Sequence, residues 1–398
     1  MEDTIVDRLA FPIMAKHSTS QQRPPRQRPE AKPQGGLPYT SFEIWNFRCI
    51  THLQVQPLKR VNLITGENNS GKTALLEALF LHAGAFNPAL VLNVAGLRGI
   101  VGVKVEYGRP IQTPWTSLFA NLDESLEIKL QGLDAARRCR VLTIRPTSDP
   151  NDLRHVRSIS EHDPTNGGST ASSANKTSVL RWHHSGGGRE DITLLFFDGP
   201  EVKVYPQVVH PPIFPGRFVG SRWTPDFVEI AEQFGELEVE NRQKQLLDSL
   251  RIIEPRLTRL ATVMTGRVPM LHADIGIERL IPIAVLGDGI LRLATIVLWI
   301  IHTSGGVLFI DEIENGFHYS HLRQIWSALA ICAKQFDVQL FATTHSRECV
   351  IAAHHSFSET FDYDFSLHRL ERSDSGNRAV TYDRESLEGA VESGFEFR

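Results

Sequence analysis

Apolar and polar positions follow two different periods along this chain, and the period changes several times. Apolar and β-branched runs at Phe42–Ile50 and Val61–Thr65 predict two strands. From Thr73 onward, leucine, phenylalanine and alanine recur every three or four residues, which predicts a helix with one buried face. The patterned part of the chain therefore begins as two strands, a loop and a helix.

The rest of the pattern predicts a β-rich middle and a second alternation of strands and helices. Four strand-like runs precede residue 206, and helical spacing continues from Thr224 through residue 264. An apolar helix then leads into the strand-like run GGVLFIDE, a further helix and the strand-like run VQLFATTH. This order predicts an α/β fold whose core is a mostly parallel sheet covered on both faces.

The same pattern divides the chain into three expected regions. Residues 1–38 are expected to be a disordered, basic, proline-rich tail, because they offer almost nothing to bury. Residues 39–105 and 269–398 should form one split head, and residues 106–268 an inserted β-plus-helical arm or lid. The tail could contact nucleic acid through its basic residues, but a solvated extension is the favoured interpretation.

Composition and charge indicate the cellular compartment of the protein more clearly than its function. The net charge of −4 gives no overall attraction to nucleic acid. The four cysteines lie far apart, which fits a reduced, cytoplasmic setting better than a disulfide framework or a zinc site. The apolar run Leu293–Ile301 is too short to span a bilayer, and no secretory segment is visible. We therefore expect a cytoplasmic protein without membrane contact.

The segment GENNSGKT satisfies the phosphate-loop pattern G-x-x-x-x-G-K-[ST] between a predicted strand and a predicted helix. Its residues are Gly66, Glu67, Asn68, Asn69, Ser70, Gly71, Lys72 and Thr73. The glycines let backbone N–H groups wrap the phosphates, and the helix N-terminus adds positive potential. Lys72 is expected to reach the β- and γ-phosphates, and the Thr73 hydroxyl to bind Mg²⁺. The segment predicts ATP and Mg²⁺ as ligands.

The segment VLFIDEIENGFH places three carboxylates directly after an apolar strand. A Mg²⁺–nucleotide site needs a carboxylate on a second strand, so Asp311 is predicted to hold the metal. Glu312 is then predicted to orient and deprotonate the attacking water. Glu314 lies beyond the strand end and is interpreted as a structural acid, with a place in the metal site as the alternative. We expect the metal and a shared water to compensate the acid pair.

The two motifs lie more than 200 residues apart, and this arrangement resembles the ABC-type ATPase heads of the SMC/RecF and OLD class. Three further stretches agree: NFR before the phosphate-loop strand, LGDGILRL at Leu286–Leu293, and FATTHS at Phe341–Ser346. The resemblance implies a P-loop NTPase fold with an ABC-type head. The chain is similar to stand-alone AAA-family, OLD-like ATPases, several of which belong to antiphage defence or are associated with DNA-repair systems.

The resemblance also implies roles for residues outside the two motifs. Gly287, Asp288 and Gly289 would face the γ-phosphate of a nucleotide held by a second protomer, so the chain would form a homodimer or larger oligomer around ATP. His345 would sense the γ-phosphate and act with Glu312 and Lys72 in catalysis. Gly287 stands where the family usually has serine, which removes a hydroxyl contact. Gln112 is a weak candidate for the family's Q-loop glutamine.

Other constellations favour ordinary interpretations. His318 and His321 lie one turn apart without an evident third metal ligand. The basic stretch Arg137–Arg140 has acids nearby, so a mixed solvated face is favoured over a DNA contact. Asp362–Asp364 copies a nuclease metal spacing, but only about fifty residues follow His345, too few for the TOPRIM domain of OLD-type nucleases. Any nuclease or effector would be a separate chain.

Two function classes follow. The first is a Mg²⁺-dependent ATPase that oligomerises around ATP to drive or gate a conformational cycle, in antiphage defence by resemblance. The second is a slowly hydrolysing, ATP-gated clamp or scaffold that binds DNA or an effector protein, which the missing serine at Gly287 keeps open. A RecF-like repair mediator is the weaker form of this second class and predicts salt-sensitive DNA binding.

Overall fold

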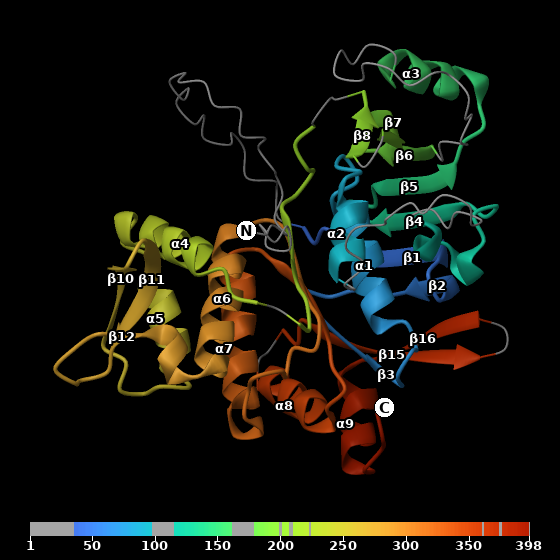
Figure 1. Cartoon of the computed structure of the whole chain (residues 1–398). Helices are drawn as coiled ribbons and strands as arrows, with labels where there is room; N and C mark the ends of the chain where they lie inside the picture. Colours follow the sequence, from blue (N-terminus) through green and yellow to red (C-terminus); the bar gives the residue numbers. More distant parts are fainter. Residues whose placement is uncertain are drawn as a thin grey trace.

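The computed structural model describes residues 36–97, 115–160, 179–198, 201–206, 210–222, 224–359, 362–373 and 376–397. Most of the expected tail and the Q-loop candidate Gln112 lie outside these described residues. Two sheets dominate the described part, and helix α1 (Lys72–Ala83) lies between them (Figure 1).

The core sheet has six strands, of which five run parallel and the edge strand β16 is antiparallel. In spatial order the strands are β16 (Gly376–Tyr382), β15 (Phe365–Ser373), β3 (Val61–Gly66), β14 (Gln339–Thr343), β13 (Val307–Ile310) and β9 (Gly216–Val219). Every residue of β3, β13 and β14 is buried, as expected for parallel strands covered on both faces. The predicted α/β fold with a mostly parallel core is confirmed.

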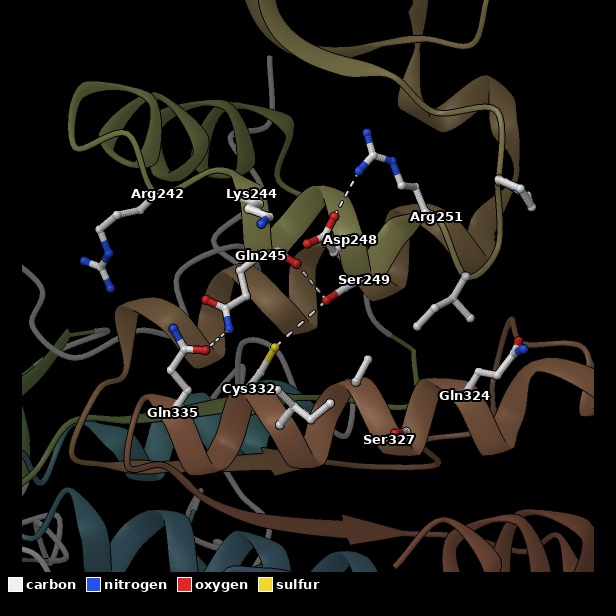
Figure 2. A pocket seen from close by; sticks show the side chains of 14 residues that line it. Arg242, Lys244, Gln245, Asp248, Ser249, Arg251, Gln324, Ser327, Cys332 and Gln335 are labelled. Carbon is white, nitrogen blue, oxygen red and sulfur yellow. Dashed lines mark hydrogen bonds and ion pairs between the residues drawn. The ribbon is translucent and has the colours of Figure 1, made fainter. Parts of the chain in front are cut away.

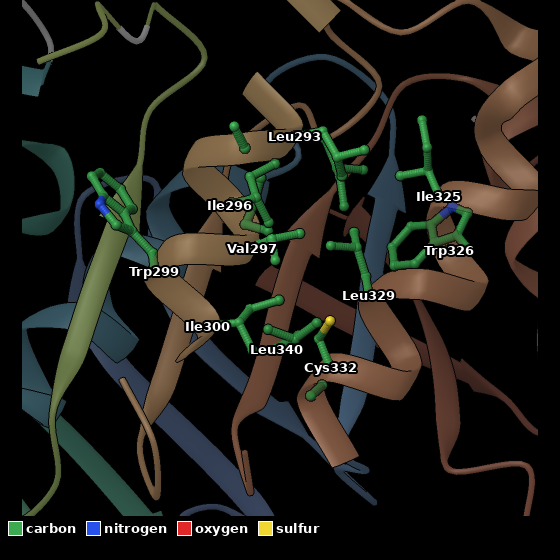
Figure 3. Packing of buried hydrophobic residues seen from close by; sticks show 14 of the residues in the cluster. Leu293, Ile296, Val297, Trp299, Ile300, Ile325, Trp326, Leu329, Cys332 and Leu340 are labelled. Carbon is green, nitrogen blue, oxygen red and sulfur yellow. The ribbon is translucent and has the colours of Figure 1, made fainter. Parts of the chain in front are cut away.

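Successive residues of β13 point to opposite faces of this sheet and enter different hydrophobic clusters. Leu308 and Ile310 pack against helices α6 (Asp288–His302), α7 (Leu322–Gln335) and α8 (Arg347–Ser358). Side chains of α6 and α7 meet over Leu340 of β14, as Figure 3 shows. Val307 and Phe309 instead pack on the side of α1.

The second sheet is antiparallel and has seven strands. In spatial order they are β2 (Ile50–Val55), β1 (Ser41–Phe47), β4 (Ile128–Leu133), β5 (Cys139–Pro146), β6 (Leu180–Gly186), β7 (Arg189–Asp198) and β8 (Glu201–Tyr205). The single strand expected at Phe42–Ile50 is wrong, because the chain turns at Arg48 (φ 54°) and returns as β2. Asn46 also has positive φ (57°), which helps to reverse the chain.

Helix α1 is buried on nearly all sides rather than on the one face expected from its sequence. Eleven of its twelve residues are buried, and Thr73 is the exception. Its leucines pack with Ile44 and Leu130 of the antiparallel sheet and with Ile64 and Phe309 of the core sheet. A helix between two sheets has no solvent face, so its polar residues must be satisfied internally. Its N-terminus, which opens the phosphate loop, is thereby fixed relative to both sheets.

Smaller elements complete the structure. The remaining helices are α2 (Leu90–Leu97), α3 (Pro150–Ser160), α4 (Phe227–Val239), α5 (Lys244–Leu250) and α9 (Arg384–Glu392), with short 3-10 turns at η2 (Thr116–Leu118), η3 (Ala120–Leu122), η4 (Ile283–Leu286) and η5 (Tyr319–His321). A three-stranded sheet of β10 (Arg259–Thr265), β11 (Val268–Asp274) and β12 (Ile281–Pro282) lies with α4 and α5 at the end of the molecule opposite the antiparallel sheet (Figure 1). None of the described helices is long and apolar enough to cross a membrane.

The helical spacing expected from Thr224 through residue 264 holds only in part. Helices α4 and α5 form, but α5 ends at Leu250 and Arg259–Thr265 is strand β10. Pro255 interrupts the helical run, and the β-branched Thr262 and Val263 suit a strand.

The sheet pairings do not follow the expected boundary between head and arm. Strand β1 pairs with β4 across residue 106, with Ile44 opposite Leu130. Strand β9 falls within the expected arm, yet it pairs in parallel with β13 in the core sheet. The division into a head and an arm therefore stays a prediction about folding units. The four residues of β9 were too short a run to be identified from their sequence.

Gly306 lies where β9 approaches β13 closely, and we predict that a larger residue at this position lowers the stability of the fold. A Cβ on Gly306 would lie 2.0 Å from the carbonyl oxygen of Pro215, a backbone atom that cannot move freely. Gly306→Ala should therefore lower the free energy of unfolding by about 1–3 kcal/mol. Urea unfolding followed by circular dichroism measures it. Gly235→Ala is the control: it lies in α4 with nothing within 4 Å, and it should gain about 0.5–1 kcal/mol. Equal stabilities of the two variants would contradict the packing described.

Candidate active site

The phosphate loop joins β3 to α1 and has the backbone shape that its glycines predict. Gly66 (φ 137°) and Gly71 (φ 103°) both have positive φ, and Asn69 (φ 63°) lies between them. A Cβ on Gly66 would lie 2.3 Å from the carbonyl oxygen of Leu370, so only glycine fits there. Helix α1 begins at Lys72 without a side-chain cap or an acid in its first turn. Its N-terminal N–H groups are therefore oriented to receive an anion.

Two polar groups in the loop fit a phosphate ligand. The Lys72 ammonium donates to the carbonyl oxygens of Gly66 (2.7 Å) and Glu67 (2.8 Å), so the side chain folds back over the loop. Burial lowers the pKa of Lys72, while the charges of Asp311, Glu312 and Glu314 act in the opposite direction. The Ser70 hydroxyl is buried and has no hydrogen-bond partner among the described residues. Phosphate oxygens would satisfy both groups.

Thr73 and Asp311 converge from two neighbouring elements. The Thr73 hydroxyl lies 3.2 Å from both carboxylate oxygens of Asp311, which follows the last residue of β13. The Thr343 hydroxyl at the end of β14 donates to Asp311 Oδ1 at 2.6 Å. Hydroxyl and carboxylate oxygens are ligands that Mg²⁺ accepts. No group of three His, Cys, Asp or Glu that could hold a metal occurs among the described residues, so a metal here would need phosphate or water ligands as well.

Glu312 is held in a defined orientation by its neighbours. Its backbone is left-handed (φ 48°), and its N–H donates to the Thr343 hydroxyl at 2.8 Å. Asn315 donates through Nδ2 to Glu312 Oε2 at 2.7 Å, while Oε1 faces His345 Nε2 at 3.9 Å. The Glu312 and His345 side chains are both about one-third exposed, at 36% and 39%. A partly open carboxylate of this kind can reach a water molecule.

Glu314 is hydrogen-bonded to the backbone of the turn that follows β14 and carries His345. Its Oε1 accepts the backbone N–H of His345 at 2.8 Å, and its Oε2 is buried without a hydrogen-bond partner among the described residues. Glu314, which the sequence analysis places beyond the strand end as a structural acid, therefore fixes the turn after β14.

Arg292 was missed by the sequence interpretation, and it compensates the carboxylates. It lies on α6 with 5% of its surface exposed, and its Nη2 donates to the carbonyl oxygens of Asp311 (3.1 Å) and Glu312 (3.0 Å). Burial lowers the pKa of Arg292, and the charges of Glu314, Asp311 and Glu312 raise it. The sequence analysis instead predicts that a metal ion and a shared water molecule compensate these carboxylates. A lone arginine inside a buried apolar helix was the available signal, because such a charge needs partners.

The loop Gly287–Gly289 lies at the start of α6 and faces outward. Gly287 (φ 110°) and Asp288 are exposed, and no side chain caps the helix. Gly289 instead approaches the loop of residues 311–316, here called the acid loop, where an added Cβ would lie 2.5 Å from the carbonyl oxygen of Gly316. This helix start therefore adjoins the acid loop of its own chain.

The remaining sequence candidates form ordinary structural contacts. His318 bonds to Ser320, and its ring centre lies 6.3 Å from that of His321. Asp362 pairs with Lys334, and Asp364 pairs with Arg60, so the Asp-x-Asp spacing is used in ion pairs.

Of the basic residues in the β1–β2 turn and in Arg137–Arg140, Arg48 and Arg140 are paired inside the fold, whereas Arg137 and Arg138 are exposed. Arg48 forms a buried ion pair with Glu77 of α1 at 2.5 Å. Arg138 and Arg140 both pair with Asp134, and Arg140 is 4% exposed.

A groove of about 980 Å³ lies away from these residues, between α5 and α7 (Figure 2). Its lining includes Ser249, whose hydroxyl approaches the Cys332 thiol at 3.9 Å, and Arg251, which pairs with Asp248 at 2.9 Å. None of the residues lining it belongs to the phosphate loop or to the acid loop.

Two family models match the chain. One, "AAA domain", covers residues 41–94, and the other, "AAA domain, putative AbiEii toxin, Type IV TA system", covers residues 187–350. Among curated proteins, an ATP/GTP phosphatase of Helicobacter pylori is 23% identical over 379 residues, which are 87% of this chain and 96% of that protein. The DNA replication and repair protein RecF of Nitrosococcus oceani is 48% identical over 42 residues, which are 11% of this chain and 12% of RecF.

Solved structures with a similar arrangement include an SMC head bound to the C-winged helix domain of ScpA, with 12% identity, a TM-score of 0.46, and coverage of 89% of this chain and 99% of that one. The SMC head domain from Thermotoga maritima has 11% identity, a TM-score of 0.39, and coverage of 87% and 99%. One family model contains the phosphate loop and the other contains Asp311, Glu312 and His345. Residues 41–94 and 187–350 thus match AAA ATPase domains, and with the similarity to an ATP/GTP phosphatase they support ATP hydrolysis by this chain.

Proposed function

We propose that this ATPase binds Mg²⁺–ATP in its phosphate loop and hydrolyses it in a site completed by a second copy of the chain, so that hydrolysis drives or gates a conformational cycle. The observation that carries this proposal is the convergence of the phosphate loop with the acid loop: Thr73 Oγ1 lies 3.2 Å from Asp311, and Glu312 follows directly. The groups proposed to bind the nucleotide and the groups proposed to hydrolyse it thus lie together at one end of the core sheet.

Binding of the triphosphate is assigned to the loop backbone, Lys72 and Ser70. Lys72 already spans the loop through two carbonyl oxygens, so its ammonium is placed to exchange them for phosphate oxygens. Thr73 and Asp311 would hold Mg²⁺. The bound metal would neutralise charge on the phosphate oxygens.

Glu312 is proposed to take the proton of the attacking water. Asn315 occupies Glu312 Oε2, which leaves Oε1 on the side of His345 as the oxygen that accepts this proton. Glu314 fixes the His345 backbone, so the imidazole is placed beside the reacting oxygen and can donate to a γ-phosphate. Water activation and phosphate sensing would then share one small set of contacts.

Completion of the site by a second copy is supported by the exposed start of α6. The Gly287 N–H donates to the Ala284 carbonyl oxygen, but no side chain caps the N–H groups that follow it, so these could bind an anion supplied from outside the chain, with the Asp288 carboxylate in the same turn acting against it. Large exposed side chains occur nearby in the sequence: Val285, two residues before Gly287, is 70% exposed, and Tyr319, three residues after Gly316, is 69% exposed. Exposed apolar groups beside an anion-binding helix start fit a face that another copy covers. A homodimer is the simplest assembly, and a larger oligomer satisfies the same contacts.

The biological role proposed is antiphage defence, with a separate effector or nuclease chain as partner. The description of the longer family model as a toxin of a Type IV TA system supports this choice. A second candidate is a slowly hydrolysing clamp for DNA or an effector protein, which is favoured by glycine in place of serine at Gly287. The short match to RecF supports DNA as the ligand of that clamp.

The first prediction concerns Glu312. Glu312→Gln keeps the Asn315 contact but removes the proton acceptor, so steady-state phosphate release with Mg²⁺–ATP should fall by at least about 100-fold. The variant should remain bound to ATP and oligomeric in mass measurements. Glu388→Gln, an exposed acid on α9, is the control and should behave as wild type. Undiminished turnover in Glu312→Gln contradicts the assigned base, and a monomer in saturating ATP contradicts the shared site. A wild type that associates with ATP but does not turn over favours the clamp.

A further prediction concerns Thr343, whose hydroxyl joins Asp311 to the Glu312 backbone. Thr343→Val keeps the shape and removes both hydrogen bonds. A bond to a charged group contributes about 1.5–3 kcal/mol, so kcat should fall by roughly 10- to 100-fold. Thr343→Ser retains the hydroxyl and should stay close to wild type. The role given to Thr343 is wrong if the valine and serine variants turn over ATP equally.

A further inference from the structure

The groove between α5 and α7 is a hollow that the groups assigned to ATP hydrolysis do not use (Figure 2). Its volume of about 980 Å³ is large enough for a ligand or for part of a peptide. The residues that line it from α7 recur at helical spacing and include Gln324, Ala328, Ile331 and Gln335. Ile331 is 60% exposed, so this wall of the groove presents an uncovered apolar side chain.

The opposite wall of the groove is basic. The basic lining residues are Arg242, Lys244 and Arg251, and Asp248 is the acid among them, so the lining carries a side-chain charge of +2. Arg251 pairs with Asp248, and Arg242 pairs with Glu240 outside the lining. Lys244 is exposed and forms no ion pair with the described residues. The groove therefore suits a segment that carries both acidic and apolar side chains.

The sequence of this chain contains such a segment, outside the described residues. Residues 2–14, EDTIVDRLAFPIM, belong to the expected tail but differ in composition from its proline-rich part, which begins near Lys16. Three acids and one arginine give residues 2–14 a side-chain charge of −2, opposite in sign to that of the groove. Six of these thirteen residues are large and apolar: Ile5, Val6, Leu9, Phe11, Ile13 and Met14. Their transfer from water to an apolar surface is favourable.

The first described residues lie close to the groove. The Tyr39 N–H donates to Gln339 Oε1 at 2.9 Å, and the Tyr39 carbonyl oxygen accepts from Gln339 Nε2 at 2.7 Å. Gln339 follows the lining residue Gln335 by four positions, so their Cα atoms are at most about 14 Å apart. Residues 15–35 can span at most about 70 Å, which allows residues 2–14 to reach the groove of their own chain. A covalent tether also raises the effective concentration to the millimolar range, so a small contact area suffices.

We propose that residues 2–14 dock in the α5–α7 groove of their own chain. Their apolar side chains would cover Ile331, and their acids would face Arg242 and Lys244. This inference goes beyond the proposed function. The lining residues of the groove lie outside the phosphate loop and the acid loop, so docking and ATP hydrolysis can be tested separately.

The test replaces Phe11 in the full chain with the photo-reactive residue p-benzoylphenylalanine, and mass spectrometry identifies the cross-linked peptides. Position 11 should become joined to residues 242–255 or 324–335, which contain the lining of the groove. The same replacement at Gln22, in the proline-rich part of the tail, is the control and should give far fewer of these products. An equal amount of isotope-labelled chain without the photo-reactive residue is present in each reaction. Products that join two copies are then recognised by their mass.

Two variants of the groove test which contacts hold the segment. Ile331→Asp replaces the exposed apolar contact with a repelling charge, and Lys244→Glu reverses the unpaired charge. Each should lower the yield of cross-linked groove peptides at least about fivefold, the factor that corresponds to about 1 kcal/mol. Met264→Asp is the matched control, because Met264 is 61% exposed on β10 and does not line the groove. It should react like wild type.

Three results would overturn the proposal. If position 11 reacts with groove peptides no more than position 22 does, residues 2–14 are not the occupant, and an acidic segment of another protein becomes the candidate. If the products join position 11 mainly to the labelled chain, the segment docks on a second copy. If both Ile331→Asp and Lys244→Glu leave the yield unchanged, the apolar and charged contacts assigned to the groove do not hold the segment.

Discussion

The structure depends on the gathering of three neighbouring carboxylates at the end of β13, where Asp311 is buried and Glu312 and Glu314 are partly buried. Charges brought together out of water are unstable unless opposite charge and hydrogen bonds compensate them. Here Arg292 holds the backbone under Asp311 and Glu312, and Lys72 adds a second positive charge from the phosphate loop. The apolar helix α6 has to carry a buried arginine for this purpose. Consequently the outward-facing start of α6 and the loop that carries these acids are packed against each other.

The parallel sheet determines which groups can meet. Strands β3, β14 and β13 are neighbours, with Leu340 opposite Val61 and Val307 opposite Gln339. The carboxyl ends of parallel strands lie at one edge, where α/β proteins bind their ligands. The phosphate loop follows β3, the acid loop follows β13, and His345 follows β14 closely. Helix α1 lies between two sheets and fixes the loop relative to both. Three segments distant in sequence thereby form one site.

The sequence predicted those parts of the molecule whose information is local. The phosphate loop, the acid strand and the alternation of strands and helices each depend on neighbouring residues, and from them the α/β core could be inferred. The carboxylate of Asp311 could be placed near Thr73 because both motifs follow parallel strands.

Other features could not be read locally, because distant contacts determine them. Strand β9 has four residues and becomes a strand by pairing with β13. The turn at Arg48 is stabilised by its ion pair with Glu77 on α1, and strand β10 by pairing with β11. The role of Arg292 depends on two carbonyl oxygens nearly twenty residues away. An arginine in an apolar helix signals that a partner is needed, but only the fold identifies it.

The central claim of the proposed function is that a second copy of the chain completes the catalytic site. The most direct measurement is the ATPase activity per chain, in saturating Mg²⁺–ATP, as the protein is diluted from micromolar to nanomolar concentration, with mass determined on the same samples. The account predicts that activity per chain falls in step with the loss of oligomer, because the catalytic site then lacks its second half. Constant activity per chain in samples that contain only monomer would contradict it.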